Sequence, residues 1–187
     1  MPSILSGALM GIFILSGSSA TTTVANIFGN PAAPAQTYSV SMTGYNAVPS
    51  QTDDSPMTTA SGAFSNADIV AARSVDLAGE LPFGTVIEIT PGEDASPSCG
   101  ISLVRQYIGL RVIADSMHPR KRNQIDILFA MNDSVGGRGI HNPAEILGVC
   151  KDVQIKVVGH VDVKDMPKTQ GELAIRVGKF PALASAK

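Results

Sequence analysis

Apolar and polar residues alternate over short stretches through most of the chain, and turn-forming residues separate these stretches. A period of two is typical of β-strands, in which successive side chains point to opposite faces of a sheet. The alternating or β-branched stretches are 38–45, 69–72, 85–90, 109–115, 125–129, 153–159 and 173–177. The stretch over 67–72 is equally compatible with a helix. Short strands between Gly, Pro, Asp and Ser turns predict a β-barrel or a β-sandwich.

One segment has the signals of a short helix. Asn142 is a good capping residue, Pro143 follows at the first helical position, and Gly148 stands where a helix would end. We therefore expect a helix over 142–148 in a chain that is otherwise mainly β. The folded domain is expected over 37–165, and residues 166–187 form a C-terminal extension that adds one more strand.

The N-terminus contains an apolar stretch, residues 4–15, which has the length of a signal-peptide core and is shorter than the ~20 residues of a membrane-spanning helix. Small residues that suit a cleavage site follow at 18–20 and 23–25. Residues 1–25 are therefore a predicted signal peptide, and 26–36 a linker. No Lys or Arg precedes the apolar stretch, so an uncleaved anchor or a wrongly assigned start stays open. With a signal peptide the protein would be secreted or periplasmic, in the cell envelope.

Composition narrows the classes of partner. Charged residues make up 16% of the 187 residues and the net charge is −2, so no basic surface for nucleic acid or an anionic membrane is expected. The absence of Trp and the 5% of aromatic residues also argue against a platform for stacking bases. Nucleic acid is therefore not an expected partner, and no later stretch is long enough to span a membrane.

Cys99 and Cys150 are the two cysteines of the chain. In an exported protein they predict one disulfide, whereas in the cytosol they would be two buried thiols. Neither belongs to a CxxC pair or lies near a His at the spacing of zinc ligands. A structural metal site is therefore not expected.

Several short motifs follow one another in a particular order along the domain. They read TGY at 43–45, TD at 52–53, TTASG at 58–62, VAA at 70–72, LPFGTV at 81–86, VIADSM at 112–117 and NQIDI at 123–127. Together, over about residues 40–160, they resemble the 3D domain, a family named for three aspartates. The resemblance implies a small six-stranded double-psi β-barrel with one or two short helices. The same fold occurs in lytic transglycosylase A, rare lipoprotein A and expansins, which act on or bind peptidoglycan or cellulose.

Two aspartates are the strongest candidates for chemistry. Asp126 lies between Ile125 and Ile127, and a carboxylate among apolar neighbours is expensive to bury unless it is hydrogen-bonded or used. Alternation along this strand turns both isoleucines to the core and Asp126 to the opposite face. A hairpin-like connection could place Asp115 on the same side, and a second carboxylate together with burial raises the pKa of the first toward that of a general acid.

The resemblance assigns the catalytic role to Asp126 and a tuning role to Asp115. The alternative is that both carboxylates cap strands by accepting bonds from backbone N–H groups. The third aspartate is less well matched, because the family position holds Arg73 and Asp76 fits only if the loop is longer here. The segment 116–122 also departs from the family, which has glycines after Asp115.

The residues expected to bind sugar are Thr43, Tyr45, Thr58 and Thr59, which supply hydroxyls and one aromatic ring. Thr is also a good strand residue, so a structural role stays open. The scattered histidines at 118, 141 and 160 are more typical of loop or packing residues. The basic run 120–122 is expected to be a solvated loop, with contact to the carboxylates of peptide stems as the functional alternative.

The sequence therefore predicts an exported barrel protein that acts on cell-wall glycan, with a peptidoglycan lytic transglycosylase as the leading function. As the resemblance implies, that reaction needs one acid and no metal or other cofactor. Two alternatives stay open: a non-catalytic, expansin-like glycan-binding module, and a structural protein of the envelope. A groove beside Asp115 and Asp126 that can take several sugar rings would distinguish an enzyme or a glycan-binding module from a structural protein.

Overall fold

The structure is a computed structural model, and it describes residues 36–91, 99–133, 135 and 142–179. The predicted signal peptide and nearly all of the predicted linker lie outside these residues. The strands are β1 (Thr37–Asn46), β2 (Val70–Arg73), β3 (Thr85–Thr90), β4 (Leu110–Ser116), β5 (Gln124–Phe129) and β6 (Cys150–His160). The helices are η1 (Val75–Ala78), α1 (Ile101–Ile108), α2 (Pro143–Leu147), η2 (Val163–Asp165) and α3 (Gln170–Arg176).

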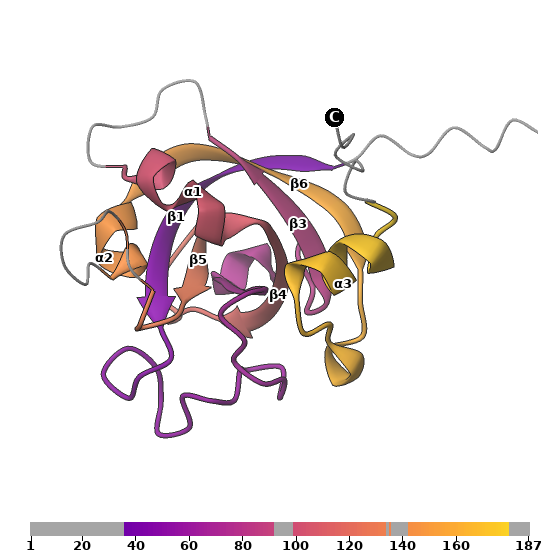
Figure 1. Ribbon diagram of the computed structural model, residues 1–187, viewed down its shortest axis with the longest axis horizontal. Helices are drawn as coiled ribbons and strands as arrows, with labels where there is room; N and C mark the ends of the chain where they lie inside the picture. Colours follow the sequence, from indigo (N-terminus) through magenta and orange to yellow (C-terminus); the bar gives the residue numbers. More distant parts are fainter. Residues whose placement is uncertain (1–35, 92–98, 134, 136–141, 180–187) are drawn as a thin grey trace, which may run out of the picture. The chain divides into compact units, whose positions relative to one another are not determined.

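The strands close a six-stranded barrel in the order β1-β5-β2-β4-β3-β6 (Figure 1). The pairs β1–β5 and β2–β4 are parallel, and the other four neighbouring pairs are antiparallel. The predicted mainly β class and closed barrel are confirmed, and the mixed strand order is compatible with a double-psi barrel. Every stretch from 38 to 159 that was expected as a strand is one, including the ambiguous stretch at 69–72.

Alternation along the strands divides the apolar residues into two layers. One cluster fills the barrel interior and includes Ile113, Ile125 and Ile127, all without exposed surface. The second cluster includes Ala72 and Leu173 and lies on the outer side of β2, β4 and β5, against α3 and the long loops. The prediction that Ile125 and Ile127 face the core is thereby confirmed, and Asp126 between them is on the outer side.

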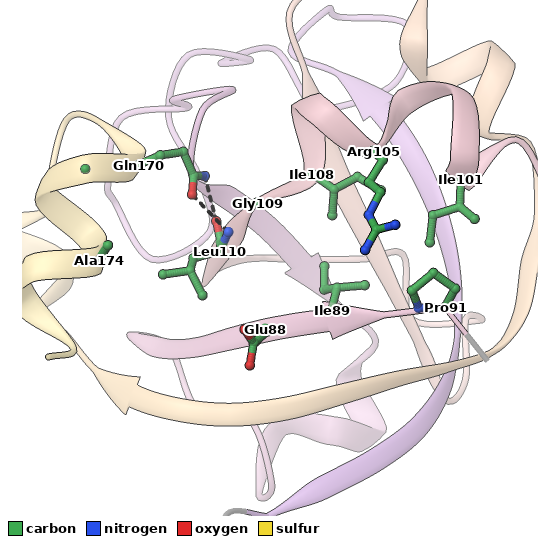
Figure 2. Close-up of a pocket in the computed structure, with 11 residues that line it drawn as sticks. Glu88, Ile89, Pro91, Ile101, Arg105, Ile108, Gly109, Leu110, Gln170 and Ala174 are labelled. Carbon is green, nitrogen blue, oxygen red and sulfur yellow. Dashed lines mark hydrogen bonds between the residues drawn. The ribbon is translucent and has the colours of Figure 1, made fainter. Parts of the chain in front are cut away.

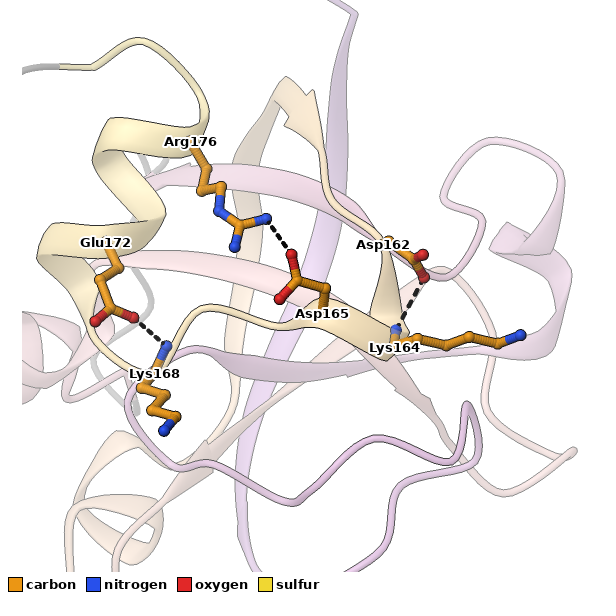
Figure 3. Close-up of polar contacts among 6 residues, drawn as sticks. All are labelled: Asp162, Lys164, Asp165, Lys168, Glu172 and Arg176. Atoms are coloured by element: carbon orange, nitrogen blue, oxygen red, sulfur yellow. Dashed lines mark hydrogen bonds and ion pairs between the residues drawn. The ribbon is translucent and has the colours of Figure 1, made fainter.

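The expected strand at 173–177 is wrong, because this stretch lies in and just after α3. The sequence T-Q-G-E at 169–172 supplies a helix start, in which Thr169 Oγ1 accepts a bond from the Glu172 N–H at 3.2 Å. Glu172 Oε2 in turn accepts a bond from the Lys168 N–H at 2.7 Å, as Figure 3 shows. This reciprocal arrangement resembles a capping box. The ion pair between Arg176 and Asp165 then connects the helix end to the preceding segment at 2.8 Å.

The described residues contain three α-helices where one or two helices were expected. The helix predicted over 142–148 is confirmed as α2, whose cap Asn142 accepts a bond from the Ala144 N–H at 3.0 Å. Helix α1 was not predicted, although it buries Ile101, Val104 and Ile108 at helical spacing. None of the helices in the described segments is long and apolar enough to cross a membrane.

Cys99 and Cys150 form a disulfide with their Cα atoms 4.7 Å apart. The bond connects Cys99, two residues before α1, to Cys150, the fully buried first residue of β6. It thus joins the segment that leads into α1 to the start of β6.

Arg111 is fully buried in β4. Its guanidinium donates hydrogen bonds to the backbone carbonyls of Ile108, Tyr107 and Ala67. A cation at the C-terminus of a helix satisfies carbonyl groups that have no partner within the helix. This side chain therefore anchors the end of α1 to the barrel wall.

Candidate active site

The two predicted aspartates lie on β4 and β5, which are separated in the barrel by β2. Ala72 of β2 pairs with Asp126 of β5 on one side and with Asp115 of β4 on the other. The register between β2 and β4 shifts by one residue after Ala71, so that Ala114 has no partner of its own. Because of this bulge, both Ala114 and Asp115 face outward, and the small side chain of Ala72 lies between the two carboxyl groups.

A cleft with a volume of about 460 Å³ opens over this part of the barrel. Its walls come from β1, the long loop before β2, the ends of β4 and β5, and the loop between them. It is lined by Tyr45, Gln51, Thr52, Asp53, Pro56, Thr58, Ala60, Ala72, Asp115, Ser116, Met117, His118, Pro119, Lys121 and Asp126. The structure thus brings Asp115 and Asp126 into one open cleft.

A second cavity, of about 480 Å³, lies between β3, α1 and α3 (Figure 2). Its lining is largely apolar, and its one carboxylate, Glu88, forms an ion pair with Lys179 at 2.6 Å. The two polar ends of the Gln170 side chain bond to the backbone of Leu110 and so close one wall. This cavity has the slightly larger volume, but the two predicted aspartates, Asp115 and Asp126, line the first one.

Asp126 is held by one side of its carboxyl group. The Thr43 hydroxyl donates to Asp126 Oδ1 at 2.8 Å, and the Gln124 amide donates to the Thr43 oxygen at 2.8 Å. The hydrogen bond from the Gln124 side chain occupies the Thr43 oxygen as an acceptor, so the hydroxyl hydrogen of Thr43 points at Asp126. No described residue donates to Oδ2. Since no buried side-chain oxygen of the described residues lacks a partner, Oδ2 keeps exposed surface, and Asp126 lines the cleft.

Burial raises the pKa of Asp126 from its ordinary value of 3.8 to about 6. The hydrogen bond from Thr43 and the positive charge of Lys121 act in the opposite direction, and the negative charge of Asp115 adds to the rise. Burial therefore dominates, as it does for carboxyl groups that act as acids near neutral pH. A proton on Oδ2 would face the cleft.

Asp115 has a different environment from Asp126. Its Oδ1 accepts bonds from the backbone N–H groups of Ala60 and Ser116, each at 2.9 Å, and its Oδ2 accepts one from the Tyr45 hydroxyl at 2.9 Å. Three hydrogen-bond donors therefore surround this one carboxyl group. Burial, followed by the charge of Asp115, raises the pKa of Tyr45, so the phenol keeps the proton it donates. The Asp115 carboxyl group is therefore held by β1, by its own chain neighbour and by the loop before β2.

The predicted sugar-binding hydroxyls take different positions. Thr58 lines the cleft, and Tyr45 lines it while its hydroxyl is bonded to Asp115. Thr43 lies behind Asp126 as its hydrogen-bond donor. Thr59 is buried, and its hydroxyl donates to the Ala63 carbonyl at 3.0 Å, away from the residues that line the cleft.

The structure does not bring Asp76 to the cleft. Asp76 is exposed in η1, where its Oδ2 accepts a bond from the Asn123 N–H at 2.9 Å. A hydrogen bond with the Ser74 side chain lowers its pKa. Asp76 thus contacts Asn123, the residue directly before β5, and β5 presents Gln124 and Asp126 on its outer face.

Arg73 occupies the position where the family resemblance would place an aspartate. Its side chain is buried, with Nε donating to the Leu81 carbonyl at 2.8 Å and the guanidinium 4.8 Å from the centre of the Phe83 ring. These contacts fold the segment after β2 back on the barrel. Among the histidines, His118 lines the cleft and His160 does not, while His141 lies outside the described residues.

Two participants in the site were not predicted from the sequence. Gln124 has a detectable signal, since it lies two residues before Asp126 and alternation places both on one face. The backbone N–H of Ala60 has none, because every residue except Pro carries that group.

The described segments contain no group of three or more His, Cys, Asp or Glu side chains placed to hold a metal ion. No protein-family model matches the chain, and no curated protein matches it.

Proposed function

We propose that this protein is a cell-wall glycan-cleaving enzyme of the 3D-domain type, most specifically a peptidoglycan lytic transglycosylase with Asp126 as its general acid. The observation that supports it is the asymmetry of Asp126. One carboxyl oxygen is fixed by Thr43, and the other is open to the cleft, in a group whose pKa is raised to about 6. Such a group can hold a proton and deliver it to a bound substrate.

The proposed reaction needs only this acid and the substrate. Asp126 donates its proton to the glycosidic oxygen as the bond from that oxygen to the anomeric carbon breaks. The 6-hydroxyl of the same sugar attacks the anomeric carbon and closes a 1,6-anhydro ring. The proton of that hydroxyl passes to the Asp126 carboxylate, which restores the acid. Because water is not the nucleophile, a second carboxylate to activate water is unnecessary.

Asp115 has a supporting role in this proposal. Ala72 lies between Asp115 and Asp126 in the sheet, and the negative charge of Asp115 favours the protonated form of Asp126. The same charge would stabilise the positive charge that develops at the anomeric carbon in the transition state. Thr43, Gln124 and Tyr45 are then positioning residues, which hold the two carboxyl groups through direct or relayed hydrogen bonds.

We also propose export of the protein to the cell envelope, where peptidoglycan is found. The apolar N-terminal stretch and the disulfide between Cys99 and Cys150 support this location, because disulfides persist in oxidising compartments.

The decisive experiment measures release of 1,6-anhydro-muropeptides from purified peptidoglycan. Asp126→Asn keeps the shape of the side chain and removes the acid, so we expect a loss of about 10²–10⁴-fold in rate with the fold intact. Asp76→Asn, a change outside the cleft, is the matched control. Wild-type activity in Asp126→Asn would contradict the proposal. A wild-type protein that binds the glycan without cleaving it would indicate the glycan-binding module instead.

A further inference from the structure

The loop between β4 and β5 carries a compact basic turn, which we define as residues 118–122. The Lys121 N–H donates to the His118 carbonyl at 2.9 Å, and the Arg120 N–H donates to His118 Nδ1 at 3.2 Å. The Arg122 guanidinium bonds to the carbonyls of Pro119 and Lys121. The basic turn therefore has a defined conformation, in which Arg122 is engaged with the turn's own backbone.

Lys121 is the strong base of this turn that lines the cleft, and it shares the cleft with Asp126. Its charge is close enough to lower the pKa of Asp126. Its side chain is exposed, and no described carboxylate forms an ion pair with it. The cleft thus presents an uncompensated ammonium group beside the proposed acid.

The other charged groups of the cleft limit where a negative group of a ligand could bind. Asp115 and Asp53 also line it, and both repel an anion. The Asp115 carboxyl group already accepts three hydrogen bonds, and Asp53 Oδ1 accepts one from the Ser55 N–H at 2.8 Å. A ligand anion in the cleft therefore has one favourable place, at Lys121.

We infer that Lys121 is a specificity-determining residue that binds a carboxylate of the substrate, so that the cleft prefers glycan strands carrying carboxylates near the bond to be cleaved. This inference rests on the proposed function and names the substrate chemistry of the same site. The carboxylate belongs either to a peptide stem or to a sugar substituent. In either case the bound carboxylate neutralises the positive charge of Lys121, and that charge then no longer favours loss of the proton from Asp126.

The test compares Lys121→Gln with Lys164→Gln. Lys164 is an exposed lysine on η2, and its side chain points away from the neighbouring acidic groups (Figure 3). Both variants remove one positive charge, but only the first removes it from the cleft. The three substrates are intact peptidoglycan, the same material with its carboxylates converted to amides, and glycan strands from which an amidase has removed the stems. Cleavage rate and sedimentation binding are measured on each.

We expect the wild-type protein and Lys164→Gln to prefer intact over amidated peptidoglycan by roughly 2–5-fold, the range of a solvent-exposed ion pair. Lys121→Gln should lose this preference and treat the two substrates alike. The preference of the wild-type protein and of Lys164→Gln should also weaken as the salt concentration rises. If the wild-type protein treats strands without stems like amidated peptidoglycan, the carboxylate comes from the stem. If it treats them like intact peptidoglycan, the carboxylate comes from the sugar.

Equal binding and cleavage of intact and amidated peptidoglycan by the wild-type protein would overturn the inference. So would a preference that Lys121→Gln retains. Failure of the proposed function gives a different result, because the wild-type protein would then cleave none of the three substrates. The sedimentation measurement would still decide whether Lys121 selects carboxylates.

Discussion

The Tyr45 hydroxyl donates a hydrogen bond to Asp115 at 2.9 Å and thereby connects β1 to the end of β4 across the cleft wall. Strands β1 and β4 do not pair with each other in the barrel, so this hydrogen bond joins two parts of the site that the sheet leaves unconnected. It also explains why the ring of Tyr45 is buried while its polar end reaches the cleft.

Removal of this hydroxyl should weaken the fold and the site together. Tyr45→Phe leaves the ring in place and deprives a carboxylate of one donor, a change expected to lower the free energy of unfolding by about 1.5–3 kcal/mol. Urea unfolding measures it. Tyr38→Phe is the control, because the Tyr38 hydroxyl makes an exposed bond to Gln36 at 3.2 Å, and its loss should have little effect. Equal stability of the two variants would show that the bond to Asp115 contributes nothing.

The rate of the proposed reaction should fall as the pH rises through about 6, because Asp126 must be protonated to act as an acid. Thr43→Val removes the hydrogen bond that lowers the pKa of Asp126, so the fall should move to higher pH in that variant. Thr58→Val is the matched control, since Thr58 lines the cleft and makes no bond to Asp126. A pH profile that Thr43→Val leaves in place would exclude Asp126 as the group that titrates.

Asp126 should also make the fold less stable at higher pH. Because its pKa in the fold is raised from 3.8 to about 6, the folded state binds this proton more tightly than the unfolded state does. Wild-type stability contributed by this group is therefore present below pH ~4 and lost as the pH rises to about 6. The free energy of unfolding of Asp126→Asn, measured relative to wild type, should increase between pH 4 and pH 7. A constant difference would mean that burial does not penalise the charge.

The disulfide should contribute strongly to stability, since it closes a long loop between positions separated by 51 residues. The chain-entropy estimate for such a loop is about 3–4 kcal/mol. Replacement of both cysteines by Ala should lower the free energy of unfolding by about that amount. Reducing agent should have a similar effect on the wild-type protein and none on the double variant, and insensitivity of the wild-type protein would show that the bond is dispensable.

Local pattern was sufficient for the strands and for the orientation of the key acid. Alternation in β5 places Ile125 and Ile127 in the core, and that alone turns Asp126 outward. The strand order could not be predicted in this way, because barrel neighbours such as β1 and β5 are distant in the chain and pair through backbone groups that every residue has.

Helix α3 shows the opposite limitation. Its sequence alternates well enough to suggest a strand, but the capping contacts of Thr169 and Glu172 favour a helix and decide the local structure. The same limit applies to the site: Thr59 and Asp76 carry suitable groups, and their hydrogen bonds direct them elsewhere.

The bulge opposite Ala72 has a consequence for how this protein tolerates change. The two acids face the same way because β4 holds one residue more than β2 requires at that point. If the same residues paired without the bulge, Ala114 would lie opposite Ala72, and Asp115 would lie opposite Arg73 and face the barrel interior. Every residue of the site would then still be present in the sequence while the pair of acids no longer existed. Loss of Ala114 itself would have a different result, because Asp115 would follow Ile113 directly and still face outward opposite Ala72. Homologous chains should therefore keep an outward-facing acid opposite Ala72, with or without the extra residue.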